Sequence, residues 1–255
     1  MSDLLLPGKV AIITGAAQGI GKATAQLFVG HGAKIVVADI QIEKANETVK
    51  EIVASGGEAI AVKVDITSAT DVDQLFQQAI AVYEKVDIVV NNAGFMDDFS
   101  PVADIQDDYW KKIIDINLTG TMRMCRAAVQ VFLPQQHGVI INLASAAGMS
   151  GSRAGVAYTA SKHGIIGLTK NTAFMYADQG IRCNALAPGG VNTEMGTVFK
   201  NSNELGQRKV GSGAMNAPKL AEPSDIANAI LLMASEQARF INGAVVPVDA
   251  GWLAY

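Results

Sequence analysis

Tyr158 and Lys162 are the residues whose types and spacing point most directly to chemistry. In a helix, side chains four residues apart lie on the same face, one turn from each other. An ammonium group held beside a phenol favours the phenolate and lowers the tyrosine pKa from its ordinary value of about 10. The pair is therefore a candidate acid/base device, although the same spacing also fits two surface side chains on a helix.

The composition is that of a well-cored protein of the larger single-domain size. The chain has 255 residues, of which 49% are hydrophobic and 17% charged, and a formal net charge of -4. That charge, without any long basic run, argues against nucleic acid or an anionic membrane surface as a partner. No apolar run reaches the roughly 18 residues of a membrane span, and Leu4-Leu5-Leu6 is too short for a signal sequence. We therefore expect a cytoplasmic protein.

The cysteine and histidine content gives no sign of a metal centre. Cys125 and Cys183 are far apart in the sequence, and only three histidines are present. Neither a C-x-x-C spacing nor a paired ligand spacing occurs. We expect no metal and no disulfide framework, and we expect both cysteines to pack as small hydrophobic side chains.

A glycine-rich loop follows the first predicted strand, residues 10–13. Gly15, Gly19 and Gly21 precede an apolar-periodic segment, which gives the order strand, loop, helix. Glycines there let backbone N–H groups and a helix N-terminus approach a pyrophosphate closely. The spacing is TGxxxGxG rather than GxGxxG, so the loop matches the dinucleotide fingerprint in mechanism and not in letter.

Asp39 ends the second predicted strand, residues 34–38. A carboxylate at this position holds the hydroxyls of an adenosine ribose and repels a 2′-phosphate. Ile40 and Gln41 add no cation to offset that repulsion, so the sequence predicts NAD rather than NADP. Taken alone, Asp39 also fits a helix cap or a solvated loop acid.

Apolar strands alternate with helical segments along the rest of the chain. This alternation predicts a single-domain α/β fold, a doubly wound Rossmann-type sheet of about seven parallel strands with helices on both faces. A helix carrying Tyr158 and Lys162 runs to about residue 177. The other predicted strands are 59–64, 86–90, 139–143, 181–187 and 244–248, and the other predicted helices are 43–55, 70–83, 107–132 and 223–234.

Residues 194–218 interrupt this alternation with four glycines and little apolar periodicity. A long insertion beside the ligand-binding edge of a sheet is often a lid. We predict a substrate lid here, and a surface loop is the alternative.

Five motifs stand in order along the chain: Thr14-Gly15-x-x-x-Gly19-Ile20-Gly21, Asn91-Asn92-Ala93-Gly94, Ser145, Tyr158-x-x-x-Lys162 and Pro188-Gly189. Together they resemble the short-chain dehydrogenase/reductase family, and the resemblance covers essentially the whole sequence. It implies an oxidoreductase that moves hydride between a nicotinamide and a CH–OH carbon.

The resemblance assigns four catalytic roles. Tyr158 would be the general acid/base, and Ser145 would hold the reacting oxygen by a hydrogen bond. Lys162 would lower the Tyr158 pKa and hold the nicotinamide ribose. Asn117, an unusual polar residue between two apolar ones, matches the residue that positions a water leading from Lys162 to solvent.

The resemblance also implies a set of cofactor-binding residues spread over most strand ends. Asn91, Ala93 and Pro188 also fit purely structural roles, in strand pairing, packing and a turn. The set is Gly15, Gln18, Gly19, Ile20 and Gly21 at the pyrophosphate, Asp39 at the ribose, Asp65 and Ile66 at the adenine, Asn91, Ala93 and Gly94 in the groove, and Pro188, Gly189, Val191 and Thr193 with Tyr158 and Lys162 at the nicotinamide end.

The substrate is less defined. Arg153 could contact a polar substrate group, and a solvated loop charge is the alternative. The expected pocket residues are mostly apolar or small, which favours a hydrophobic secondary alcohol or ketone: Phe95, Met96, Ala147, Met149, Val156, Gly190 and Met195.

Two other functions stay open. A reductase of 3-oxoacyl groups on a carrier protein shares these motifs, and Arg123 and Arg126 are possible contacts for an acidic carrier. A protein that only binds dinucleotide is the third possibility, although such proteins typically lose the tyrosine or the lysine. By resemblance we also expect a homotetramer that pairs segments 107–132 and 155–177.

Overall fold

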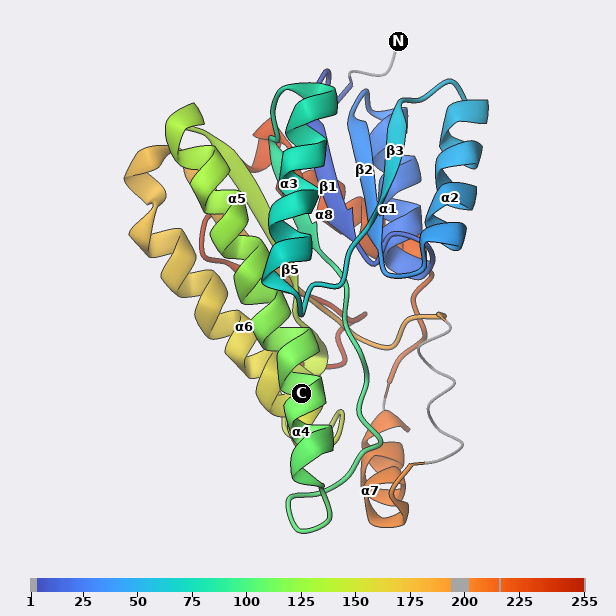
Figure 1. The fold of residues 1–255 in the computed structure, drawn as a ribbon. Helices are drawn as coiled ribbons and strands as arrows, with labels where there is room; N and C mark the ends of the chain where they lie inside the picture. The colour runs from blue at the N-terminus through green and yellow to red at the C-terminus, as the bar shows by residue number, and fades with distance from the viewer. Residues whose placement is uncertain (1–3, 194–201, 216, 255) are drawn as a thin grey trace.

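The computed structural model describes residues 4–193, 202–215 and 217–254. Its centre is a parallel sheet of seven strands in the order β3-β2-β1-β4-β5-β6-β7 (Figure 1). The predicted doubly wound α/β fold is confirmed, and the strand bounds lie close to the predicted ones. The strands are β1 Val10–Thr14, β2 Lys34–Asp39, β3 Ala59–Lys63, β4 Ile88–Asn91, β5 Gly138–Leu143, β6 Ile181–Pro188 and β7 Val245–Val248.

The central strands are apolar on both faces because helices cover both faces. All residues of β1 and β4 are buried, as is nearly all of β2. Strand β1 pairs with β2 on one side and with β4 on the other. The strand order therefore reverses at β1, and ligands of such sheets bind in the crevice at the carboxyl ends of the strands beside this reversal.

Two helical layers flank the sheet in Figure 1. Helices α1 (Gly19–Gly30), α2 (Ile42–Ala54) and α8 (Pro223–Ala234) cover one face, where Phe28, Ile52 and Ile230 pack on the strands. Helices α3 (Ala69–Tyr83), α5 (Thr121–Gln135) and α6 (Val156–Met175) cover the other, where Leu75 and Phe132 pack.

The single helix predicted over residues 107–132 is wrong in one respect. The structure has α4 (Asp107–Ile114), then a π-helical turn (Asp115–Gly120), then α5. A π-turn holds an extra residue within the helix and often marks a functional site. Here it contains Asn117, which is fully buried.

The interrupted stretch at 194–218 contains a helix that its sequence pattern did not predict. Helix α7 (Glu204–Ala214) begins after Asn203, whose side chain accepts a hydrogen bond from the Gly206 N–H at 3.0 Å. Figure 1 shows α7 beyond the carboxyl ends of the strands, apart from the two layers. Residues 194–201 and 216 of the predicted lid lie outside the described residues.

None of the helices in the described ranges is both long enough and apolar enough to cross a membrane. Within those ranges no three His, Cys, Asp or Glu side chains are grouped as a metal site. Cys125 and Cys183 are buried free thiols, and burial raises the pKa of Cys125 to about 12. Both cysteines therefore pack as hydrophobic side chains, as the sequence predicts.

At the amino edge of the sheet, Asp87 is a buried carboxylate with several partners. It accepts from the Val10 N–H at 2.8 Å, contacts His137 Nε2 at 2.7 Å and pairs with Lys85 at 2.9 Å. Burial alone would raise the pKa of Asp87, but these bonds outweigh it and lower that pKa below 3.8. The anionic form therefore ties the start of β1 to the start of β4.

We predict that Asp87→Ala lowers the free energy of unfolding by about 2–3 kcal/mol at pH 7, because it leaves the buried Val10 N–H without an acceptor. Since folding lowers the Asp87 pKa, the stabilisation is present above pH 3.8 and is lost as the pH falls through the folded value. Urea unfolding at several pH values measures this. Glu58→Ala, which breaks the exposed Lys34–Glu58 pair, is the control and should change little. An equal loss in both variants would contradict the prediction.

Candidate active site

Ser145 and Tyr158 come together at the carboxyl edge, beside the end of β5. Ser145 follows β5, and its Oγ accepts from the Ala147 N–H at 3.1 Å, which caps a short 3₁₀ turn (Ala146–Gly148). Gly148 packs directly on the main chain of Lys162. The loop after β5 is thus fixed against α6, and the Ser145 side chain is close enough to Tyr158 to lower its pKa in part.

The Tyr158 hydroxyl is less acidic in this structure than the sequence led us to expect. Burial raises the pKa of Tyr158 to about 12, the Ser145 side chain lowers it in part, and the charge of Asp97 raises it. The net shift in the protein alone is therefore upward, and the lowering of this pKa by Lys162 stays a prediction. The physical reason is burial, because Tyr158 is only 7% exposed.

Lys162 lies under the tyrosine ring and points to the end of β5. Its Nζ is 5.3 Å from the Tyr158 ring centroid and donates to the Leu143 carbonyl oxygen at 2.8 Å. Burial lowers the pKa of Lys162 to about 8. At neutral pH the ammonium form predominates, and it becomes neutral as the pH rises through that value.

Asn117 joins the π-helical turn to the loop after β4 and to α6. Its Oδ1 accepts from the Phe95 N–H at 2.7 Å, and its Nδ2 donates to the Phe95 carbonyl at 2.9 Å and to Ser161 Oγ at 3.2 Å. A Cβ on Gly94 would lie 3.3 Å from Asn117 Oδ1 and 3.6 Å from Lys162 Nζ. Asn117, Gly94 and Lys162 therefore converge, as the predicted site requires.

Two glycines of the loop after β1 have a left-handed main-chain conformation, and a Cβ at Gly15 would lie 2.9 Å from Asn92 Nδ2. Gly15 and Gly19 have φ of 63° and 55°, which favour glycine. Asn92, which sequence reasoning did not single out, donates to the carbonyls of Thr14 and Gly15 at 3.0 Å each. The signal for it was its place between two predicted site residues, Asn91 and Ala93. It pins the loop to the end of β4.

Gly21→Ala is predicted to destabilise the protein by about 1–3 kcal/mol, as overpacking does. A Cβ at Gly21 would meet the Gly15 carbonyl and come within 2.7 Å of Asn92 Nδ2. Thermal or urea unfolding measures the loss. Gly30→Ala, at the end of the same helix, has no atom within 4 Å of its Cβ and should be neutral or stabilising. Similar effects at both glycines would show that the loop tolerates a side chain.

Asp39 holds the glycine loop from the neighbouring strand end. Its Oδ2 accepts from the Ala17 N–H and its Oδ1 from the Gln41 N–H, both at 3.0 Å. Sequence reasoning missed a cation nearby, since Lys44 Nζ on α2 donates to Gln18 Oε1 at 2.9 Å. A close-fitting glycine cradle beside a fixed carboxylate fits a dinucleotide.

The residues predicted around the adenine and the groove are partly or fully buried. Asp65 turns its carboxylate to Thr67, with bonds of 2.8 Å and 2.7 Å, and Ile66 is buried against Gly120. Asn91 is 4% exposed, and its Nδ2 donates to Asn142 Oδ1 at 2.8 Å. Its side chain thus ties β4 to β5, which was the structural alternative.

The residues predicted at the nicotinamide end follow β6. Gly189 packs on Asp249, Val191 pairs with Ala221 in an isolated parallel bridge, and Thr193 Cγ2 lies 3.4 Å from the Cβ position of Gly19. An open hollow of about 470 Å³ lies beside this contact; its lining is Gln18, Gly19, Asn192, Thr193 and Pro223. The segments that follow β1 and β6 therefore border one hollow.

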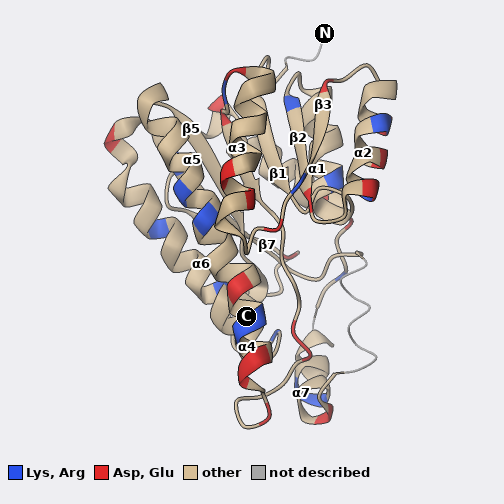
Figure 2. Cartoon of the chain, in the orientation of Figure 1, with Lys and Arg blue, Asp and Glu red and all other residues tan. Residues whose placement is uncertain are grey.

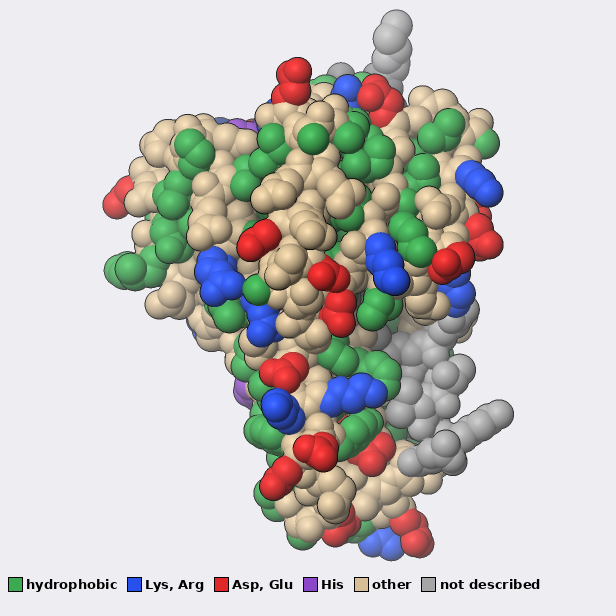
Figure 3. Space-filling model, in the orientation of Figure 1, with side chains coloured by type: hydrophobic (Ala, Val, Ile, Leu, Met, Phe, Trp, Pro, Cys, Tyr) green, Lys and Arg blue, Asp and Glu red, His purple; other side chains and the backbone are tan. Residues whose placement is uncertain are grey.

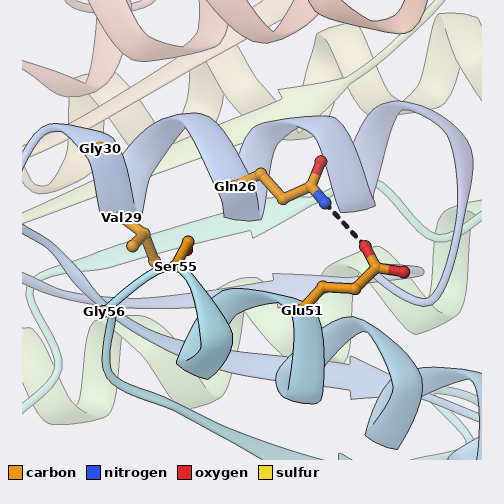
Figure 4. A pocket seen from close by; sticks show the side chains of 7 residues that line it. Gln26, Val29, Gly30, Glu51, Ser55 and Gly56 are labelled. Atoms are coloured by element: carbon orange, nitrogen blue, oxygen red, sulfur yellow. Dashed lines mark hydrogen bonds between the residues drawn. The ribbon is translucent and has the colours of Figure 1, made fainter.

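Another hollow, also of about 470 Å³, lies between α1 and α2 (Figure 4). Gln26 donates to Glu51 across it at 2.9 Å, and Gly30 and Ser55 mark the ends of the two helices. Those ends lead into β2 and β3, so this hollow is at the amino edge of the sheet. It is separate from the site described above.

The predicted pocket residues are apolar around Tyr158. Met96 and Ala147 pack with it in a small cluster, and Phe95 and Met149 are 38% and 43% exposed. Met195 lies outside the described residues.

Arg153 is not a solvated loop charge, because it has protein partners. Its guanidinium stacks 4.0 Å over the Trp252 ring and donates to the Gly213 carbonyl at 3.1 Å. It thus joins the loop before α6 to α7 and to the C-terminal segment, contacts that no local sequence pattern encodes.

Comparison with known proteins adds relatives over the full length. Residues 15–253 match a family model described as enoyl-(acyl carrier protein) reductase. The chain is 42% identical over 252 residues to 3beta-hydroxysteroid dehydrogenase 2 of Eggerthella lenta, covering 98% of this chain and 97% of that protein. It is 41% identical over 255 residues to the short chain dehydrogenase/reductase dpchG of Colletotrichum higginsianum, covering 97% and 94%.

A further relative and a solved structure agree with this. A 3-oxoacyl-(acyl-carrier-protein) reductase of Synechocystis sp. is 37% identical over 252 residues, covering 98% of this chain and 99% of that protein. The crystal structure of gox2181 has a TM-score of 0.92 at 31% identity, covering 99% of this chain and 98% of that one. On this evidence the chain belongs to the short-chain dehydrogenase/reductase family, oxidoreductases that act on CH–OH groups with a nicotinamide dinucleotide.

Proposed function

We propose that this protein is an NAD-dependent dehydrogenase/reductase that interconverts a hydrophobic secondary alcohol and its ketone. The observation that carries the proposal is the convergence of Ser145, Tyr158 and Lys162 beside the dinucleotide cradle. The Ser145 side chain lowers the pKa of Tyr158 in part, and Lys162 Nζ lies 5.3 Å from the Tyr158 ring centroid.

In oxidation, Tyr158 would take the hydroxyl proton of the alcohol, while Ser145 would donate a hydrogen bond to the same oxygen. When bound, the nicotinamide would supply the hydride acceptor and, when oxidised, a positive charge. Lys162, cationic below about pH 8, adds a second positive charge that favours phenolate. Asn117 fixes the loop after β4 through both Phe95 main-chain groups and so supports this geometry.

NAD is the proposed cofactor because of Asp39. Its carboxylate is 7% exposed and is held by two backbone N–H groups of the adenosine side of the cradle. Bringing a 2′-phosphate beside a fixed carboxylate would place two negative charges together, whereas free ribose hydroxyls would donate to it.

A hydrophobic substrate is supported by the apolar surroundings of Tyr158 and by the hydroxysteroid dehydrogenase among the relatives. Figures 2 and 3 show acidic and basic side chains interspersed over the face in view, with no extended basic surface among the described residues there. Helix α4 carries Asp107 and Asp108 at its start and Lys111 and Lys112 at its end. This distribution fits a small-molecule substrate better than nucleic acid.

A 3-oxoacyl-carrier reductase is the alternative that a relative's name favours. Arg123 and Arg126 lie on α5, where a cationic surface would suit an acidic carrier. Its substrate would also be a ketone reduced at Tyr158. The two functions therefore differ in the cofactor used and in whether the ketone is attached to a carrier protein.

The deciding experiment measures turnover with NAD and NADP on cyclic alcohols, hydroxysteroids, sugars and a 3-oxoacyl thioester with and without its carrier. We expect NAD-linked oxidation of bulky apolar alcohols. NADP-linked reduction confined to the carrier thioester would favour the alternative. Tight NAD binding without turnover of any compound would support a protein that only binds dinucleotide.

We also propose a homotetramer that pairs the segments of α5 and α6. The end of α6 exposes Phe174 and Met175, at 83% and 58%, which suits burial against another copy. Light scattering coupled to size exclusion measures the mass, and a monomer at micromolar concentration would refute the proposal.

A further inference from the structure

Asp97 is a fully buried carboxylate on the segment that leads from β4 to α4. Its Oδ1 accepts from the Gly155 N–H at 2.9 Å, and its Oδ2 from the Tyr158 N–H at 2.8 Å. Both donors belong to the first turn of α6. The side chain therefore bonds directly to the main chain of the residue that carries the reactive hydroxyl.

The first turn of α6 depends on this distant acid because it has no cap of its own. Gly155 is the N-cap residue and has no side chain to bond the free N–H groups. Asp97 takes that place from 58 and 61 residues away in the sequence. Its negative charge also suits the positive end of the helix dipole.

The contact is closely fitted from both sides. A Cβ on Gly155 would lie 2.6 Å from Asp97 Oδ2 and 2.7 Å from Oδ1, so any side chain there would displace the carboxylate. Phe99, two residues on, is buried with φ of 64°, a left-handed conformation that a bulky residue rarely adopts. Its N–H donates to Asp97 Oδ1 at 3.2 Å.

The same segment supports α7. The Asp98 carbonyl accepts from the Asn203 N–H at 2.8 Å, and Gly206 packs directly on the Phe99 carbonyl. The strained segment 97–99 is thus held by the catalytic helix on one side and by α7 on the other. Strain persists where surrounding contacts over-determine it, and it gathers at functional sites.

We propose that Asp97 is a positioning residue for the reaction: its carboxylate sets where the first turn of α6 presents the Tyr158 hydroxyl to the substrate. This rests on the proposed function, since it concerns the same proton transfer.

Asp97 also acts on Tyr158 through its charge. Among the described residues, three titratable groups interact electrostatically with Asp97: Asp98 on its own segment, Tyr109 from α4 and Tyr158 from α6. Asp97 raises the pKa of Tyr158, after the larger effect of burial. Removing the charge should therefore let Tyr158 lose its proton at lower pH.

The test compares Asp97→Asn with Asp98→Asn in the full chain. In Asp97→Asn the amide N–H₂ would face the N–H of Gly155 or Tyr158, so one donor would lose its acceptor. We expect kcat for alcohol oxidation to fall about 10-fold to 100-fold, as a displacement of the reactive hydroxyl by about 1 Å would cause. The Kd for NAD should not change, and the acidic limb of the kcat/KM profile should move to lower pH. Asp98→Asn removes one negative charge from the neighbouring residue. The Asp98 carboxylate accepts from the Ser100 N–H at 3.1 Å and, in the described part of the chain, not from α6. Asp98→Asn should leave kcat and the limb unchanged.

Gly155→Ala disturbs the contact from the helix side while keeping the charge, so kcat should fall without movement of the limb. If Asp97→Asn does not fold, the kcat of Gly155→Ala tests the proposal instead. If Asp97→Asn and Gly155→Ala fold and keep the wild-type kcat, the proposal is overturned. It is also overturned if Asp98→Asn loses as much kcat as Asp97→Asn. If the wild type oxidises no alcohol, the proposed function fails by itself. Hydrogen exchange of residues 155–162 then still tests Asp97, because faster exchange in Asp97→Asn alone supports the contact and unchanged exchange refutes it.

Discussion

Tyr158→Phe is expected to lower kcat for oxidation of a secondary alcohol by about 10²–10⁴-fold, the usual contribution of a general acid or base. The substitution removes one oxygen atom and keeps the ring, which packs with Met96 and Ala147. Stability and the Kd for NAD should therefore change little. Steady-state turnover with NAD and any active alcohol measures the effect.

The pH dependence sharpens this prediction. The profile of kcat/KM for the alcohol reports the enzyme before the alcohol binds, and burial raises the Tyr158 pKa of the protein alone to about 12. Oxidation needs the phenolate, so its kcat/KM should rise with pH through the alkaline range. Reduction needs the phenol, so it should not show this rise. In Tyr158→Phe the alkaline rise should disappear together with the rate.

Tyr176→Phe is the matched control, since Tyr176 caps the far end of the same helix. It should keep the wild-type rate and pH profile. Undiminished turnover in Tyr158→Phe would refute the assigned mechanism. An equal loss in Tyr176→Phe would indicate damage to α6 rather than to proton transfer.

The sheet could be predicted because each strand carries its own signal. In β1, for example, Ile12 and Ile13 are both apolar and pack on opposite faces of the sheet, and no partner is needed to recognise that pattern. Asn117 shows the limit. Its helix was expected to continue, but the π-turn follows from bonds between its amide and Phe95, 22 residues earlier in the chain.

The site residues could be named from motifs, but their electrostatics could not. The spacing of Tyr158 and Lys162 predicted their shared face, whereas the pKa of each depends on burial by other segments. Asp97 was not identified, and the contacts of Arg153 were not predicted, for the same reason. Their partners on α6, α7 and the C-terminal segment lie 58, 60 and 99 residues away in the sequence. Local patterns identify the groups; only the tertiary fold defines their environment.

Asp39→Asn is predicted to remove most of the preference for NAD. In the wild type, repulsion of about 3 kcal/mol between the carboxylate and a 2′-phosphate would favour NAD by about 100-fold in kcat/KM. Asparagine keeps the shape and one acceptor for the Ala17 or Gln41 N–H groups. The ratio of kcat/KM with NAD to that with NADP should therefore fall to within about tenfold of unity, chiefly through better use of NADP.

Glu43→Gln is the control, because it removes one acidic charge from the first turn of α2 without touching the glycine loop. Its cofactor ratio should stay that of the wild type. Lys44, which bonds to Gln18, provides the competing explanation, since a cation there could attract a 2′-phosphate. If Lys44 set the preference, the wild type would favour NADP and Asp39→Asn would change the ratio little. If Asp39 sets it, added salt should narrow the wild-type ratio by screening the repulsion and should leave the Asp39→Asn ratio nearly constant.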